Sequence, residues 1–214
     1  MTETTRWWWV RHAPVSNPDG VIYGHSDFAA EPSGLAEMQA LAACLPRDAV
    51  WITTSLRRAR DTAQSLARYC APAAALREDD GFREQSFGEW EGSRWDELPA
   101  AESAAYWHDP VALRAPGGES FADVVERVAA AMDRLNGECA GGDVVVVAHA
   151  GSIRAGLVHA LGCAPQAGLA FRLDPLSLTR MEAIRRDGAL WWRVAGVNLP
   201  GIARDALGKP GTFD

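Results

Sequence analysis

Basic side chains stand where two hydrophobic segments of the chain end. Arg11 and His12 directly follow the hydrophobic run 7–10, and His149 comes after the valine run 144–147. In open α/β folds, ligands collect at the carboxyl ends of the strands. A guanidinium fork suits paired anionic oxygens, and an imidazole that is neutral near pH 7 is a good nucleophile. The two segments therefore predict a site for an anionic substrate.

The pattern of apolar residues predicts the elements that hold these side chains. Short apolar stretches alternate with segments whose apolar residues recur at helical spacing, which is typical of a parallel sheet covered by helices. We expect strands at 6–10, 48–54 and 144–148, helices at 35–45, 57–69 and 119–139, and a helix from about Ser152. Segments 178–184 and 190–197 flank Asp187-Gly188, a strong signal for a hairpin turn. Together they predict a three-layer α/β/α sandwich with a mostly parallel central sheet.

The middle of the chain, 81–118, has a different character. It holds three tryptophans among acidic residues and is interrupted by three prolines, so we expect short helices and loops there. We interpret this segment as a lid over the carboxyl ends of the strands rather than as a second domain. Because 214 residues is an ordinary length for one domain, we expect 1–214 to form a single domain.

Composition argues against several classes of function. The net charge of −7 opposes a nucleic-acid-binding surface, which needs a basic patch. No apolar stretch approaches the ~20 residues that a membrane span requires, and the first residues do not resemble a signal peptide, so we expect a cytoplasmic protein. No spacing resembles a metal cluster, so we expect neither metal nor cofactor. We expect free thiols at four scattered positions, Cys44, Cys70, Cys139 and Cys163. A monomer and a homodimer formed through the hairpin edge both stay open.

Four segments carry chemistry-bearing residues in a fixed order. They are 10–14 (VRHAP), 54–63 (TSLRRARDTA), 82–92 (FREQSFGEWEG) and 147–154 (VAHAGSIR). In this order and spacing they resemble the histidine phosphatase superfamily, in the branch that includes cofactor-dependent phosphoglycerate mutases and α-ribazole phosphatases. The likeness runs from about residue 6 to residue 160. The wording of 11–14 (RHAP) and 23–27 (YGHSD) looks closer to α-ribazole phosphatases than to mutases.

The resemblance implies roles for five side chains and a phosphoglycerate mutase-like fold. His12 would attack phosphorus and become a phosphohistidine, while Arg11, Arg58 and His149 would hold the phosphoryl oxygens. Glu84 would protonate the leaving alkoxide and then activate the water that hydrolyses the phosphohistidine. For the first of these steps it must carry a proton near neutral pH, which burial beneath the lid would favour.

Two further phosphate contacts follow from the same comparison. The free N–H groups where a helix opens at Ala150 favour an anion. The phosphate-contacting asparagine of the family matches Asn17 with a shift of one position, and Ser16 is the alternative. Four charged residues near these motifs have a plainer interpretation. We interpret Arg57 and Arg60 as solvated charges of a helix, and Glu89 and Glu91 as caps or salt links.

We therefore expect a metal-independent phosphomonoesterase that acts on a small phosphorylated metabolite, with α-ribazole phosphate as one candidate. The first alternative is phosphoglycerate mutase-type transfer, which needs extra basic groups in the lid. The stretch after Glu84 is acidic, and this favours hydrolysis. The second alternative is a non-catalytic module that binds phosphorylated ligands. Loss of His12 or Glu84 would have supported that alternative, and both are present.

Overall fold

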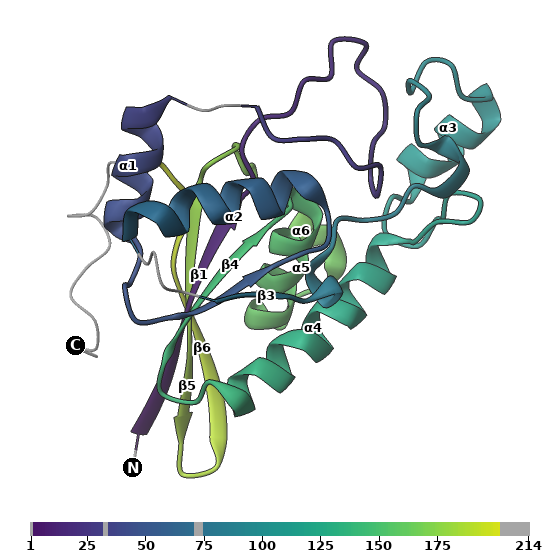
Figure 1. Ribbon diagram of the computed structural model, residues 1–214. Coiled ribbons are helices and arrows are strands. Elements are labelled where there is room, and N and C mark those ends of the chain that lie inside the picture. Colours follow the sequence, from purple (N-terminus) through teal and green to yellow (C-terminus); the bar gives the residue numbers. More distant parts are fainter. Residues whose placement is uncertain (1, 32–33, 71–74, 202–214) are drawn as a thin grey trace.

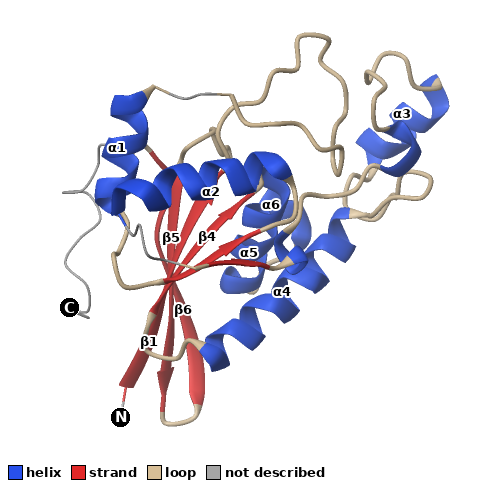
Figure 2. Ribbon diagram, in the orientation of Figure 1, coloured by secondary structure: helices blue, strands red, loops and turns tan. Residues whose placement is uncertain are grey.

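The computed structural model describes residues 2–31, 34–70 and 75–201 (Figure 1). The elements follow one another as β1 (Thr2–Arg11), α1 (Leu35–Cys44), β2 (Val50–Thr53), α2 (Arg57–Cys70), β3 (Leu76–Glu78), α3 (Ala100–His108), α4 (Phe121–Glu138), β4 (Asp143–Ala148), α5 (Ala150–Leu161), α6 (Pro165–Leu169), β5 (Leu178–Arg186) and β6 (Ala189–Leu199). Two short 3-10 helices, Asp80–Phe82 and Gly88–Trp90, precede α3. Helices cover both faces of one sheet (Figure 2), so the predicted three-layer α/β/α sandwich is confirmed.

The sheet has the strand order β3-β2-β4-β1-β5-β6. The four strands β3, β2, β4 and β1 pair in parallel, whereas β5 is antiparallel to both of its neighbours. Among the described strands only β5 therefore runs against the rest, and the sheet is mostly parallel as predicted. The β5–β6 hairpin turns at Asp187 and Gly188, which both have positive φ angles (51° and 83°), as a tight two-residue turn requires. All carboxyl ends of the parallel strands meet at one edge of the sheet.

The tryptophan run in β1 shows how the sheet is held between two helical layers. Side chains alternate along a strand, so Trp7 and Trp9 join the core beneath α4 and α5, and Trp8 and Val10 join the core beneath α1 and α2. The rings of Trp7 and Trp9 are stacked with centroids 5.7 Å apart. The predicted role of this run as buried packing is confirmed, and it fixes the strand that ends at Arg11.

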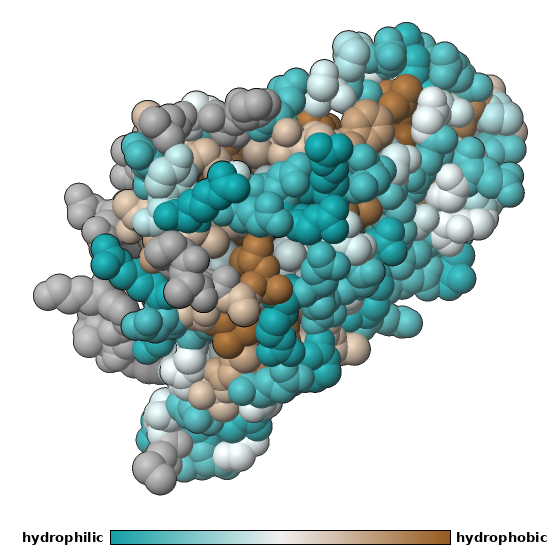
Figure 3. Space-filling model, viewed as in Figure 1, coloured by the Kyte–Doolittle hydropathy of each residue, from teal (hydrophilic) through white to brown (hydrophobic). Residues whose placement is uncertain are grey.

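The segment 81–118 has a small apolar core of its own. Its aromatic side chains pack with Ile22, which belongs to the long loop after β1. The cluster consists of Ile22, Phe87, Trp90, Trp95, Leu98, Tyr106, Leu113 and Ala115. In Figure 1 this segment, with α3, lies beyond the start of α4 on the side where the parallel strands end. Figure 3 shows a largely hydrophilic face with small hydrophobic areas beneath α2 and near this segment.

Three details differ from the sequence expectations. Strand β1 begins at Thr2 rather than at Arg6, because its first residues pair with β5 at the far end of the hairpin. The sequence pattern does not predict the three-residue β3 or the five-residue α6. Among the described residues, no disulfide joins the four cysteines, as expected. None of the described helices is long and apolar enough to cross a membrane.

Candidate active site

Strand register brings two histidines together at the carboxyl edge of the sheet. The last paired residues of β1 and β4 are Arg11 and Ala148, and His12 and His149 follow them directly. The backbone N–H of His12 donates to the Ala148 carbonyl at 2.9 Å, which extends the pairing by one step. The two imidazole rings lie with centroids 5.2 Å apart, and both side chains are buried. Residues separated by most of the chain therefore share one site.

His12 is held as a neutral imidazole with one free nitrogen. Its Nδ1 lies 2.7 Å from the carbonyl oxygen of Ala13. A carbonyl oxygen only accepts, so Nδ1 carries the hydrogen and Nε2 keeps its lone pair. Burial lowers the pKa of His12 to about 3, and the nearby cations Arg58 and Arg11 act in the same direction. Throughout the neutral range His12 thus presents an unprotonated Nε2, the form that a nucleophile requires.

Arg58, on the first turn of α2, is fully buried and holds the loop after β1. Its Nη1 donates to the carbonyl of Ser26 at 2.9 Å and its Nη2 to that of Gly24 at 2.6 Å. The guanidinium also lies over the Tyr23 ring, 4.9 Å from the centroid. Burial lowers the pKa of Arg58, and the negative charge of Glu84 partly offsets this effect.

Two buried donors at this edge are not satisfied by the protein. Nε of Arg58 and Nε of Arg11 are both buried, and neither finds a hydrogen-bond partner within the described part of the chain. The Nη1 of Arg11 donates to the Leu173 carbonyl at 2.5 Å, which fixes that side chain. Unpaired buried donors are rare in folded proteins because they are costly. A bound anion would satisfy both of them.

His149 stands at the junction between β4 and α5. Its Nε2 lies 2.9 Å from Oγ1 of Thr54, and its backbone N–H donates to Oγ of Ser152 at 3.2 Å. Complete burial lowers the pKa of His149 well below its usual value, and nearby His12 and Arg58 act in the same direction. Helix α5 begins at the next residue, Ala150. The first turn of this helix, with its partial positive charge, thus lies beside the two histidines.

Glu84 reaches the same place from the segment after β3. Its Oε1 accepts hydrogen bonds from the backbone N–H groups of Gly151, at 3.0 Å, and Gln85, at 2.9 Å. A side chain at position 151 would clash, since a Cβ built on Gly151 would lie 2.1 Å from that oxygen. The glycine therefore permits the approach of Glu84 to the start of α5. Both bonds fall on one carboxylate oxygen, and no described residue donates to Oε2.

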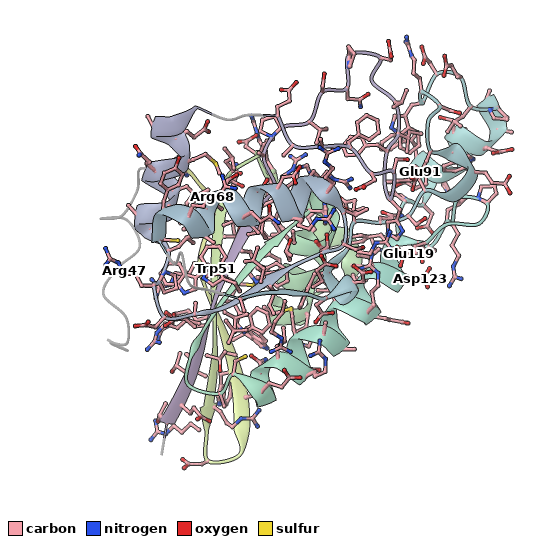
Figure 4. The ribbon with its side chains drawn as sticks, viewed as in Figure 1. Arg47, Trp51, Arg68, Glu91, Glu119 and Asp123 are labelled. Carbon is pink, nitrogen blue, oxygen red and sulfur yellow. The ribbon has the colours of Figure 1, made fainter. Side chains whose placement is uncertain are left out.

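Arg127 and Glu119, which the sequence analysis does not single out, hold the backbone around Glu84. Arg127, in the middle of α4, donates from Nη2 to the Glu84 carbonyl at 2.9 Å and from Nη1 to the Gly81 carbonyl at 3.0 Å. It also forms an ion pair with Glu119 at 2.7 Å, and Glu119 accepts from the backbone N–H of Ser86 at 2.9 Å. Figure 4 labels Glu119 just before the start of α4. No local pattern reveals these contacts, since they depend on how α4 packs on the loop.

Glu91 joins segment 81–118 to the loop after β1. Its Oε1 accepts from the backbone N–H groups of His25, at 2.7 Å, and Phe87, at 3.0 Å. Its Oε2 accepts from both the backbone N–H and the hydroxyl of Ser26, each at 2.7 Å. The neighbouring Glu89 is exposed. This geometry agrees with the interpretation of Glu91 as a structural carboxylate (Figure 4).

Asn17 and Ser16 lie in the loop that follows His12. The side-chain amide of Asn17 bonds at both ends to Val21, with Nδ2 donating to its carbonyl at 2.9 Å and Oδ1 accepting from its N–H at 3.0 Å. Ser16 is exposed. The Asn17 amide thus braces its own loop, and a phosphate contact by either residue stays a prediction.

Comparison with known proteins agrees with this geometry. The family model described as the histidine phosphatase superfamily (branch 1) matches residues 7–195, so the chain belongs to this superfamily. The matched range includes all four motif segments and the whole site. Among curated relatives, the bifunctional protein Rv2228c of Mycobacterium tuberculosis is 34% identical over 140 residues, which cover 64% of this chain. The chain spans 38% of the length of that relative.

Solved structures with the same fold include two phosphatases. The mycobacterial glucosyl-3-phosphoglycerate phosphatase Rv2419c is 26% identical and superposes with a TM-score of 0.75, over 92% of this chain and 99% of that one. A putative α-ribazole-5'-P phosphatase from Escherichia coli is 22% identical, with a TM-score of 0.78 over 93% of this chain and 98% of that one. The second likeness, at this identity, shows the fold alone.

Proposed function

We propose that this protein hydrolyses small phosphomonoesters through a phosphohistidine at His12. The observation that carries the proposal is the state of His12, a buried neutral imidazole whose Nδ1 is bonded to Ala13 and whose Nε2 keeps its lone pair. Membership of the histidine phosphatase superfamily supports it. So does the likeness to a glucosyl-3-phosphoglycerate phosphatase.

The first half-reaction transfers the phosphoryl group to the protein. Nε2 of His12 forms a bond to phosphorus while the ester P–O bond breaks and the leaving oxygen takes a proton from Glu84. Because Oε1 of Glu84 already accepts two backbone hydrogen bonds, the transferred proton is carried on Oε2. In the second half-reaction water attacks phosphorus, the P–N bond breaks, and Glu84 recovers a proton from that water.

The transferring group spreads negative charge over three oxygens, and donors that are already in place stabilise that charge. Arg11 and Arg58 supply two guanidinium groups, each with a buried Nε that has no partner among the described residues. His149 and the opening turn of α5 at Ala150 add further donors. Asn17 belongs to the same proposal through the second hydrogen of its Nδ2. Under this proposal the reaction needs no metal ion.

Hydrolysis is preferred to phosphoglycerate mutase-type transfer because the lid is acidic near the site. Glu89 and Glu91 follow Glu84, and Glu91 binds the loop after β1 rather than a ligand. Within this proposal, residues 81–118 form the lid of a single domain. α-Ribazole phosphate stays a candidate substrate because residues 11–14 and 23–27 resemble the motifs of α-ribazole phosphatases.

The test is release of phosphate from p-nitrophenyl phosphate in the presence of a chelator. We expect turnover by the wild-type protein and none by His12→Ala, with the fold of the variant checked by circular dichroism. Glu84→Gln should still form the phosphohistidine from this substrate, whose leaving group needs little protonation. Quenching in denaturant at high pH should trap it, because the P–N bond is labile in acid and stable in alkali. Substantial hydrolysis by a folded His12→Ala protein would rule out the covalent route. Isomerisation of 3-phosphoglycerate primed by a 2,3-bisphosphate would instead favour the mutase alternative.

A further inference from the structure

A third arginine, which the catalytic scheme does not use, stands beside Glu84. Arg154 follows Gly151 by three residues in α5, so the two lie on the same face of the helix. Gly151 is the residue whose N–H holds Glu84. Arg154 Nε donates to the carbonyl of Phe171 at 3.0 Å, which fixes the plane of the guanidinium. Its two Nη groups bond to no residue in the described ranges, and so they are available to a ligand.

Arg154 and the site residue Arg11 donate to carbonyls two residues apart, those of Phe171 and Leu173. The ionisation of Arg154 is influenced by Glu84, Arg11 and Tyr106, which come from three different parts of the chain. Burial lowers the pKa of Arg154, and Glu84 opposes that shift. Tyr106, on α3, feels the charges of both Glu84 and Arg154, and burial raises its pKa to about 12, so it is a neutral hydroxyl donor. The charge of Arg154 therefore acts both on the residue that handles protons and on Tyr106 of the aromatic cluster.

The balance of charge during the proposed reaction leaves Arg154 without a counterion. The phosphate dianion is matched by Arg11 and Arg58. In the step where the leaving group departs, Glu84 must begin protonated and therefore neutral. Arg154 is then a partly buried cation that faces no anion among the described residues of this site. A buried cation is strongly favoured to find an anionic partner.

We propose, building on the phosphatase function above, that the substrate is a phosphomonoester whose leaving group carries a carboxylate, and that Arg154 binds this carboxylate. Two Nη donors on one planar group match the two oxygens of one carboxylate. A carboxylate also brings the single charge that Arg154 can neutralise. The neutral hydroxyl of Tyr106, which the charge of Arg154 reaches, is a further hydrogen-bond donor for such a group. α-Ribazole phosphate has no carboxylate, so it should be a poorer substrate than a phosphorylated hydroxy acid.

Matched pairs of substrates test this inference. O-Phosphoserine and O-phosphoethanolamine differ only in the carboxylate, and 3-phosphoglycerate differs from 2-hydroxyethyl phosphate in the same way. We expect kcat/KM of the wild-type protein to be roughly 10- to 100-fold higher for the acid of each pair, the range of one charge-assisted contact. The ratio should fall to about one in Arg154→Gln and take an intermediate value in Arg154→Lys, which keeps the charge but loses the fork.

Arg172→Gln is the matched control, because Arg172 is an exposed arginine next to Phe171 that pairs with Asp174. It should keep the wild-type ratio. Hydrolysis of p-nitrophenyl phosphate monitors the phosphatase function separately. If that ester is cleaved but both pairs react equally, or if the preference survives in Arg154→Gln, the carboxylate site is overturned while the phosphatase function stands. If no ester is cleaved, the proposed function fails and this inference fails with it.

Discussion

Arg127 on α4 donates a hydrogen bond from Nη2 to the backbone carbonyl of Glu84 at 2.9 Å, although Glu84 lies 43 residues earlier in the chain, in the loop after β3. The same guanidinium holds the Gly81 carbonyl, so it binds both ends of the turn that delivers Glu84. The Glu84 side chain extends the other way, to the N–H of Gly151. The long helix α4 is therefore connected to the start of α5 through the backbone of one short segment.

Removing this support should impair proton transfer more than binding. We expect Arg127→Gln to lower kcat about 10-fold or more with a smaller change in KM, because Glu84 loses its fixed position. The loss should be larger for an alkyl phosphate than for p-nitrophenyl phosphate, whose departure needs little protonation. Glu126→Gln is the control on the same helix, since Glu126 lies on its exposed side. Equal losses with both leaving groups would show that Arg127 does not act through Glu84.

The two glutamates of the Gly88–Gly92 run should behave differently when they are replaced. Glu91→Gln removes the charge that receives four hydrogen bonds from the two loops, and we expect it to lower the free energy of unfolding by about 2–3 kcal/mol and to raise KM. Glu89→Gln, at an exposed position, should change neither quantity. Urea denaturation and steady-state kinetics of the two variants measure the difference. Equal stability and equal KM in the two variants would contradict the proposed role of the Glu91 hydrogen bonds in joining the two loops.

The lowered pKa of His12 makes a prediction for stability against pH. In the unfolded chain His12 binds a proton below about pH 6.5, whereas in the folded protein it stays neutral down to about pH 3. The unfolded state thus takes up more protons as the pH falls, and the folded protein loses stability. Between pH 7 and pH 5 the wild-type protein should lose about 2 kcal/mol more than His12→Gln. Parallel stability profiles for the two proteins would mean that His12 titrates normally in the fold.

The choice between Asn17 and Ser16 can be made by single substitutions. If Asn17 contacts phosphate, Asn17→Ala should raise KM for every substrate by a similar factor of roughly 10 or more, because all share the phosphate group. Its loop would also lose the two bonds to Val21, so proteolysis of the loop serves as a second readout. Ser16→Ala should leave KM unchanged under this assignment. The opposite pattern would assign the contact to Ser16.

The sequence predicts the sheet edge well because the signals there are local. The apolar runs 7–10 and 144–148 come directly before Arg11 and His149, and the parallel arrangement then requires His12 and His149 to meet at one edge. The helix pattern likewise predicts α4, where the structure adds a Ser120–Asp123 capping box at the start. The short elements β3 and α6 escape prediction because three or five residues show no period.

Contacts between distant segments are what the sequence cannot supply. Arg127 and Glu119 look like ordinary charges of a helix and its approach, and only the packing of α4 against residues 81–86 gives them partners near Glu84. Arg154 lies in a motif segment that the sequence does single out. Its position next to Glu84 nevertheless depends on Gly151, whose missing side chain lets the carboxylate approach.

The stacked indoles of Trp7 and Trp9 give the protein a built-in optical signal. Two such chromophores at 5.7 Å and nearly parallel planes couple electronically, so their near-ultraviolet circular dichroism depends on keeping this arrangement. Because both belong to the strand that ends at Arg11, the signal follows the strand that carries the proposed nucleophile. Loss of activity that leaves this band intact would then be assigned to the site chemistry, and loss of both to separation of the sheet.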